Sequence, residues 1–160
     1  MLNITIICVG KIKEKYYSAA IDEYIKRISR FAKISVAEVK DEPIPLSPSD
    51  GEKTAVLLKE AERIKTKLPK SAHIIALCVE GRQCSSEDFA EKLSSLASGG
   101  ISHIAFIIGG SLGLADNIKM LADEKLSFSK MTLPHQLMRV VLAEQIYRAM
   151  TINSNITYHK

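Results

Sequence analysis

The chain has 160 residues, a formal net charge of +4 at pH 7, and 46% hydrophobic residues. That length suits one domain with a substantial core, and that share of hydrophobic residues is ordinary for a globular protein. No apolar run reaches the roughly 18 to 20 residues that a membrane span needs, so we expect no membrane partner. The weak positive charge permits a nucleic-acid partner without requiring one.

The amino terminus and the cysteines indicate a reduced, cytoplasmic setting. The first apolar run, at residues 4–9, has neither the basic region nor the small-residue cleavage site of a secretion signal, so we interpret it as a strand. Cys8, Cys78 and Cys84 cannot all pair with one another, and the first two lie inside predicted strands. Because no Cys or His spacing resembles a zinc site, we expect no metal.

The first half of the chain alternates predicted strands and helices. Short β-branched runs predict buried strands, and apolar residues that recur every three or four positions predict amphipathic helices. These patterns predict a strand at 4–9, a helix at 16–28, a strand at 34–39, a helix from about 50 to 68, and a strand at 73–79. Residues 41–51 hold three prolines and form a loop that is too short to be a domain linker.

The second half continues the same alternation. It predicts a helix opened by Ser85 or Ser86 and ended by Gly99-Gly100, a strand at 101–108, a helix from 112 to about 122, a fifth strand with its exit turn inside 126–133, and a helix at 134–150. Such alternation predicts one α/β domain over residues 1–160, with a parallel sheet and helices on both faces.

A glycine-rich turn, Gly109-Gly110-Ser111-Leu112-Gly113, follows the fourth predicted strand. Turns at this edge of an open α/β sheet often bind ligands. The segment lacks the Lys-Ser/Thr of a phosphate loop, and Ile108 stands where the dinucleotide fingerprint has its first glycine. We therefore expect either close backbone approach to a ligand other than a pyrophosphate, or a strand-to-helix turn that binds nothing.

The segment 126–133 interleaves serine and threonine with apolar residues. As a strand this is ordinary alternation, whereas as a loop it offers apolar walls and backbone groups to an unphosphorylated nucleoside. His135 follows at the start of the next helix, where a histidine is more often a cap or a packed side chain than a catalyst.

The last helix is apolar around most of its surface, so it must be covered on all sides. We expect a second copy of the chain to cover it, and cover by the rest of its own chain is the alternative. The tail Tyr158-His159-Lys160 is either a frayed end or a set of donors and acceptors placed over the site. His159 brings the side-chain type most often used for general acid–base catalysis.

Together these segments closely resemble the RlmH family of bacterial large-subunit ribosomal RNA methyltransferases, small members of the SPOUT, or α/β-knot, superfamily. The resemblance covers the whole chain except the proline-rich loop. The segments that carry it are Val9-Gly10-Lys11, 106–114, 126–136, Arg139-Val140, 144–149 and Tyr158-His159-Lys160.

The resemblance implies a single-domain SPOUT α/β knot: a mostly parallel sheet flanked by helices, with a trefoil knot in the C-terminal part. It implies a homodimer through the C-terminal helix. It also implies methylation of N3 of a pseudouridine in helix 69 of 23S rRNA, within the assembled 70S ribosome. The implied methyl donor is S-adenosylmethionine, which carries no phosphate and so needs no phosphate loop. The cofactor positions carried over are Leu77, Gly109, Phe128, Ser129, Lys130, Met131, Thr132 and Leu133.

For catalysis we expect His159 to accept or relay the N3 proton, with Tyr158 and Lys160 orienting the base or stabilising its anion. His135 and Arg139 are weaker candidates, for positioning or for an RNA phosphate. Cations that could contact phosphates are Lys11, Lys13, Lys15, Lys26, Arg27, Arg30 and Arg82. Two other functions stay open: methylation of another RNA position such as a ribose 2′-hydroxyl, and a non-catalytic ribosome- or RNA-binding dimer.

Overall fold

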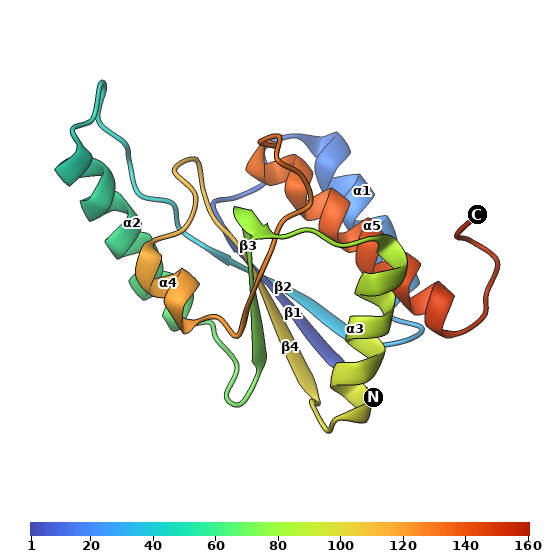
Figure 1. Ribbon diagram of the computed structural model, residues 1–160. Helices are drawn as coiled ribbons and strands as arrows, with labels where there is room; N and C mark the ends of the chain where they lie inside the picture. Colours follow the sequence, from blue (N-terminus) through green and yellow to red (C-terminus); the bar gives the residue numbers. More distant parts are fainter.

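The computed structural model describes residues 1–160, in which five strands alternate with five helices (Figure 1). The elements are β1 (Asn3–Val9), α1 (Lys15–Ile28), β2 (Lys33–Val39), α2 (Asp50–Lys65), β3 (His73–Arg82), α3 (Ser86–Ser98), β4 (His103–Ile108), α4 (Asp116–Leu121), β5 (Glu124–Leu126) and α5 (His135–Asn153). All neighbouring strands are parallel, in the order β2-β1-β4-β3-β5. The predicted α/β class and parallel sheet are confirmed.

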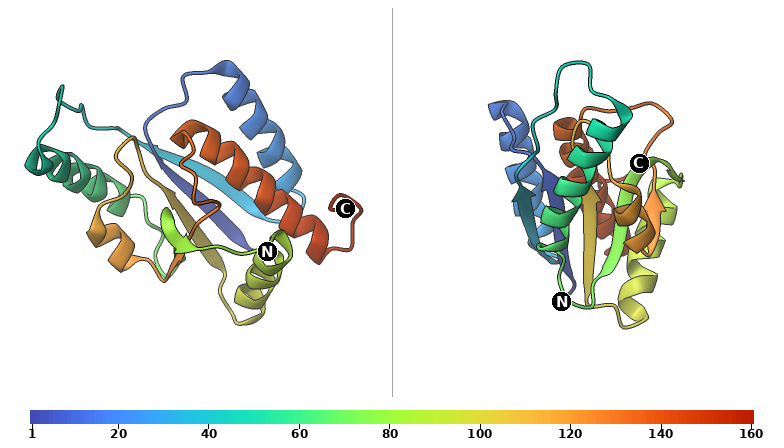
Figure 2. Two further views of the ribbon diagram at one scale, coloured as in Figure 1. Left: turned by 45° about the horizontal axis from the view of Figure 1, so that its top comes forward. Right: turned by 90° about the vertical axis from the view of Figure 1, so that its left-hand side faces the viewer.

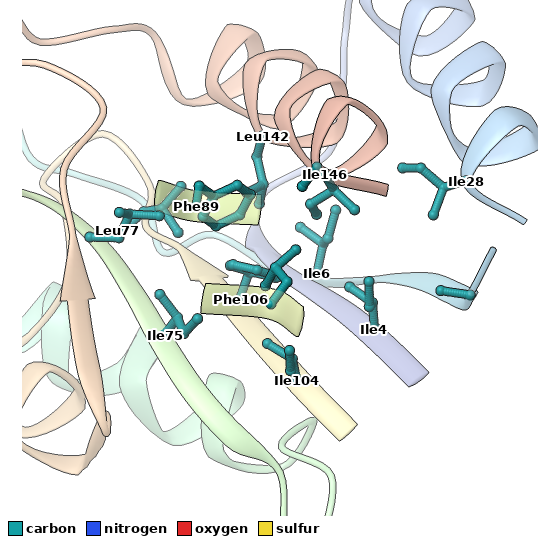
Figure 3. Close-up of a cluster of buried hydrophobic side chains, with 14 of the residues drawn as sticks. Ile4, Ile6, Ile28, Ile75, Leu77, Phe89, Ile104, Phe106, Leu142 and Ile146 are labelled. Atoms are coloured by element: carbon teal, nitrogen blue, oxygen red, sulfur yellow. The ribbon is translucent and has the colours of Figure 1, made fainter. Parts of the chain in front are cut away.

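Helices cover both faces of the sheet, which explains why the central strands are continuous apolar runs in the sequence (Figures 1 and 2). In β1, Ile4 and Ile6 belong to the larger core cluster, which includes residues of α1, α3 and α5 (Figure 3). Ile7 and Val9 belong to the second cluster, with residues of α2 and α4. Burying each such side chain contributes roughly 1.5–3 kcal/mol, so both layers stabilise the same central strands.

Side-chain hydrogen bonds define the starts of α2 and α3, and the start of α3 was left open by the sequence between Ser85 and Ser86. Ser49 caps α2. Its Oγ accepts from the Glu52 backbone N–H at 3.1 Å, and the Glu52 carboxylate accepts from the Ser49 backbone N–H. Ser85, rather than Ser86, caps α3 through the same reciprocal arrangement with Asp88. Such capping boxes satisfy backbone donors that the first helical turn leaves unpaired.

The fifth strand was placed wrongly by the sequence pattern. β5 is only three residues long and ends at Leu126, where the predicted segment begins. The alternating serines that suggested a strand instead bond locally: Ser127 Oγ donates to the Ser129 carbonyl at 3.0 Å, and Ser129 Oγ accepts from the Met131 N–H at 2.9 Å. Short side-chain hydrogen bonds of this kind compete with the strand ladder, so residues 127–134 form a loop.

Other element boundaries differ by a few residues. α4 begins at Asp116 rather than near Leu112, because the Gly113 N–H closes a tight turn onto the Gly110 carbonyl at 3.0 Å. β3 continues beyond Val79 to Arg82 and pairs there with β5. The trefoil knot in the C-terminal part stays a prediction.

The last helix is covered largely by its own chain. α5 packs beside α1 and α3, and no residue from 135 to 152 is fully exposed. The aromatic rings of Tyr24 and Phe31 lie beside Tyr147, and Asn153 donates to the Ala90 carbonyl of α3 at 2.9 Å. These contacts agree with the alternative expectation that the rest of the same chain covers α5. The homodimer stays a prediction.

No helix has the length and apolarity needed to cross a membrane. The three cysteines are free, and no cluster of three or more His, Cys, Asp or Glu side chains is placed to hold a metal ion.

Candidate functional site

A cavity of about 630 Å³ lies at the carboxyl edge of the sheet. Its walls are the end of β3, the glycine-rich turn after β4, α4, the loop 126–134 and the first turn of α5. The end of β3 lies between the two loops (Figures 1 and 2). The volume is within the range of roughly 300–1,000 Å³ that small-molecule sites occupy.

Two glycines let backbone segments meet at this edge. A Cβ atom added at Gly109 would lie 2.3 Å from the Gly113 carbonyl oxygen. A Cβ added at Gly81 would lie 2.6 Å from the carbonyl carbon of Leu126, where β3 pairs with the end of β5. No side chain fits at such distances, so both positions require glycine for the cavity to keep its shape.

The cavity lining is mostly apolar side chains and backbone. Phe128, Met131 and Leu133 from the loop face it together with Leu77 of β3 and Met138 of α5. An apolar cavity with exposed strand ends suits a flat heterocycle held by backbone groups.

One ion pair also lines the cavity. Lys119 of α4 donates to the Glu80 carboxylate at the end of β3. The hydrogen bond from Lys119 lowers the pKa of Glu80 below its ordinary value, and the bond to Glu80 raises the pKa of Lys119. Both groups therefore stay charged over the physiological pH range.

His135 lines the cavity from the start of α5. Its Nδ1 atom is buried and has no hydrogen-bond partner. Burial, followed by the positive charge of Arg139, lowers the pKa of His135, so the imidazole is neutral near pH 7. A neutral ring can accept or donate one proton at the cavity wall.

Arg139 lies one turn further along α5, and its side chain is only 2% exposed. It donates to Glu38 Oε2 at 2.7 Å, to the Gly10 carbonyl at 2.6 Å and to the Val9 carbonyl at 3.3 Å. The guanidinium thus anchors α5 to the end of β1. It does not line the cavity.

The tail is tied to the second half of α5. Tyr158 donates to Glu144 Oε1 at 3.0 Å, and its ring centroid lies 4.8 Å from that of Tyr147. His159 lies between two partners, with Nδ1 3.0 Å from Arg148 Nη1 and Nε2 2.7 Å from Glu87 Oε1. We call Glu87, Glu144, Arg148, Tyr158 and His159 the tail network.

The tail network lies away from the cavity of its own chain. None of the residues 158–160 lines the cavity, and the C-terminus lies beyond the far end of α5 (Figures 1 and 2). Burial, aided by hydrogen bonds to Tyr24 and Glu144, raises the pKa of Tyr158, so its hydroxyl stays protonated at physiological pH. Lys160 is exposed.

Comparison with known proteins identifies the family of this chain. Residues 2–159 match the family model described as "Predicted SPOUT methyltransferase". The chain belongs to this SPOUT methyltransferase family.

Curated relatives match over their full length. A ribosomal RNA large subunit methyltransferase H from Exiguobacterium sp. is 54% identical over 159 residues, which cover 99% of this chain and 100% of the relative. The protein of the same name from Bacillus cytotoxicus is 55% identical with the same coverage. Among solved structures, the tRNA (m1G37) methyltransferase from Aquifex aeolicus has a TM-score of 0.52 at 12% identity, covering 92% of this chain and 69% of that one. At that identity the likeness shows the fold alone.

In this SPOUT methyltransferase the cavity gathers most positions that the resemblance named. The ones that line it are Leu77, Gly109, Phe128, Ser129, Met131, Thr132 and Leu133. Lys130 lies in the same loop but is exposed and does not line the cavity. Of the catalytic candidates, only His135 reaches it.

The sequence reasoning missed the ion pair at the cavity. Glu80 could have been found, because a charged residue that follows a predicted strand lies at the ligand-binding edge of a parallel sheet. Lys119 had no such signal, since a lysine on a short helix is usually a solvated surface residue.

Proposed function

We propose that this protein transfers a methyl group from S-adenosylmethionine to N3 of a pseudouridine in helix 69 of 23S rRNA, on assembled 70S ribosomes in the cytoplasm. The observation that carries the proposal is the cavity at the carboxyl edge of a SPOUT sheet, lined by the segments that the resemblance named. The names of the full-length relatives, which are large-subunit rRNA methyltransferases, support the class of substrate.

The residues present fit S-adenosylmethionine. The apolar loop side chains can enclose an adenine, and the glycine turn exposes backbone groups without needing a phosphate. Leu77, Gly109 and Phe128–Leu133 would hold the molecule, with the exposed Lys130 contributing through its backbone. Bound S-adenosylmethionine supplies a methyl group on a sulfonium, whose leaving group is a neutral thioether.

Because the methyl group is already activated, the protein mainly positions the two reactants and moves one proton. N3–H of the base lies between two carbonyls and is weakly acidic, so its proton must leave as N3 attacks the methyl carbon. We assign proton acceptance or relay to His159, and orientation of the base or stabilisation of its anion to Tyr158 and Lys160. In the single chain both ring nitrogens of His159 have partners, Nδ1 with Arg148 and Nε2 with Glu87, so His159 must leave one of them to accept the proton.

The geometry of the single chain makes this assignment depend on a dimer. The tail residues do not line the cavity of their own chain, which favours action on the cavity of a second subunit. We propose a homodimer through α5 in which each tail completes the partner's site. Leu137, Val140 and Val141 of α5 are only half-buried and could form part of that contact.

The remaining candidates take supporting roles. His135 lies at the cavity wall and could position the donor or the base. Arg139 would act through its bonds to the end of β1, which hold the first turn of α5 in place. The exposed cations Lys11, Lys13 and Lys15 follow β1 at the same edge of the sheet and could contact phosphates.

The decisive experiment is mass spectrometry of rRNA from cells that lack this protein. We expect loss of one methylpseudouridine, with all other modifications retained, and its return when the gene is restored. Loss of a ribose methyl group would favour a SPOUT enzyme with another acceptor. An unchanged modification profile would favour a non-catalytic binding role and would contradict the proposal.

A further inference from the structure

We infer that Glu80 and Lys119 form the subsite for the amino-acid end of the methyl donor, with Lys119 binding its carboxylate and Glu80 binding its ammonium group. The inference rests on the proposed function, and it concerns two residues that neither the resemblance nor the comparisons single out.

The charge distribution of the cavity points to this pair. Among all residues that line it, only Glu80 and Lys119 carry a full charge near pH 7. His135 is neutral because its pKa is lowered, and the Cys78 thiol is neutral because burial raises its pKa. Every other lining group is apolar, a hydroxyl or backbone.

The ligand has a matching distribution. The adenosine part is uncharged and suits the apolar and backbone walls. The amino-acid end is a zwitterion, and its two charges lose water on entering the cavity unless charged groups replace that water. Hydrogen bonds between charged groups are about twice as strong as neutral ones, so one cation and one carboxylate are the partners this end requires.

The pair is placed so that it can exchange partners. The Glu80 side chain is 54% exposed and the Lys119 side chain 23% exposed, so solvent, and therefore a ligand, can reach both groups. They come from different elements, β3 and α4. A partly exposed ion pair contributes little to stability, so replacing it with two ligand contacts loses little.

A purely structural role is the competing explanation, since the pair could simply tie α4 to β3. The two explanations differ in ligand dependence. Removing a purely structural ion pair would change the affinity for every ligand of the cavity alike. Removing a subsite would weaken only the ligands that carry the group it binds.

Calorimetric titration with four ligands tests the difference. The ligands are S-adenosylmethionine, S-adenosylhomocysteine, decarboxylated S-adenosylmethionine and 5′-methylthioadenosine, which lacks the amino-acid end. Each is titrated into the unsubstituted protein, Lys119→Met and Glu80→Gln, with thermal unfolding as a check of the fold. Lys65→Met is the matched control, because Lys65 pairs with Glu62 at 2.8 Å on α2, outside the cavity.

We expect Lys119→Met to weaken binding of the two carboxylate-bearing ligands about tenfold. It should leave decarboxylated S-adenosylmethionine and 5′-methylthioadenosine unchanged within about twofold. Glu80→Gln should weaken all ligands except 5′-methylthioadenosine, by roughly threefold to tenfold because Glu80 is more exposed.

Equal weakening of all four ligands, or no weakening of any, would overturn the subsite. If the unsubstituted protein bound none of the four, the proposed function itself would fail. The two failures are therefore distinguishable from one set of titrations.

Discussion

The cavity lies at the first turn of α5 and the tail network along its second half, and the two are built in different ways. The cavity is made of backbone turns and apolar side chains, and its shape depends on glycines at positions where no side chain fits. The tail network is made of charged and aromatic side chains that bond to one another through Glu144, Arg148 and His159.

This contrast indicates a division of labour. The cavity has the form of a binding site but holds only one titratable group with an unpaired nitrogen, His135. The tail network has the acid–base groups but no cavity. Substitutions should therefore separate donor binding from catalysis.

Deleting Tyr158, His159 and Lys160 should lower methylation of ribosomes by at least about a hundredfold, because general acid–base groups contribute roughly 10²- to 10⁴-fold. Donor binding should stay within about twofold, since none of the three residues lines the cavity. Methylation assays and calorimetry on the same preparation check both values. Full methylation by a truncated protein that is still folded would show that the tail assignment is wrong.

Replacing Arg139 with methionine should lower the free energy of unfolding by roughly 1–3 kcal/mol, because it leaves the buried Gly10 carbonyl without its donor, whereas Glu38 is 39% exposed and can bind water instead. Arg148→Met is the matched control in the tail network. Its side chain is 24% exposed, so we expect a loss near 1 kcal/mol.

Denaturant unfolding of both variants measures the difference. Equal losses would contradict the distinction between an arginine that anchors the end of β1 and one that belongs to a surface network.

Gly109→Ala should destabilise the protein by about 1–3 kcal/mol and weaken donor binding, because the new Cβ meets the Gly113 carbonyl at 2.3 Å. Gly51→Ala on α2 is the control. Its Cβ would meet only Ser49 Oγ at 3.9 Å, and alanine favours a helix by up to about 1 kcal/mol.

Thermal unfolding and calorimetry distinguish the two glycine variants. Normal donor affinity in Gly109→Ala would mean that the glycine turn does not shape the binding site.

Protonation of His135 should have the smallest effect, a dependence of the free energy of unfolding on pH. Its pKa is lower in the folded state than the ordinary value near 6.5, so the unfolded chain binds the proton first as the pH falls. The contribution to stability is therefore complete above pH ~6.5 and decreases as the pH falls toward the lower folded pKa.

His135→Gln should remove this dependence, which we expect to be less than about 1 kcal/mol because the ring is only partly buried. An NMR titration of the His135 ring should show a midpoint below 6.5. A midpoint at or above that value would contradict the effect of burial and of the Arg139 charge.

Much of this protein follows from its sequence alone. Local patterns decide whether a segment is a strand or a helix, so the ten alternating elements and the parallel sheet could be predicted. The same reasoning places Gly109 at the ligand-binding edge, because parallel strands all end there, whereas Leu77 was named only through the family resemblance. The segment after Leu126 was misjudged as strand because the Ser127 and Ser129 hydroxyls bond within the loop.

Only the tertiary structure decided which side chains meet. The ion pair of Glu80 with Lys119 joins two elements 39 residues apart, and the contact of Arg139 with Glu38 spans 101 residues. The same holds for the tail, whose sequence suggested reach toward a site while its contacts tie it to Glu87 and Glu144. Periodicity reports which face of an element is buried, whereas the identity of its neighbours depends on how the whole chain packs.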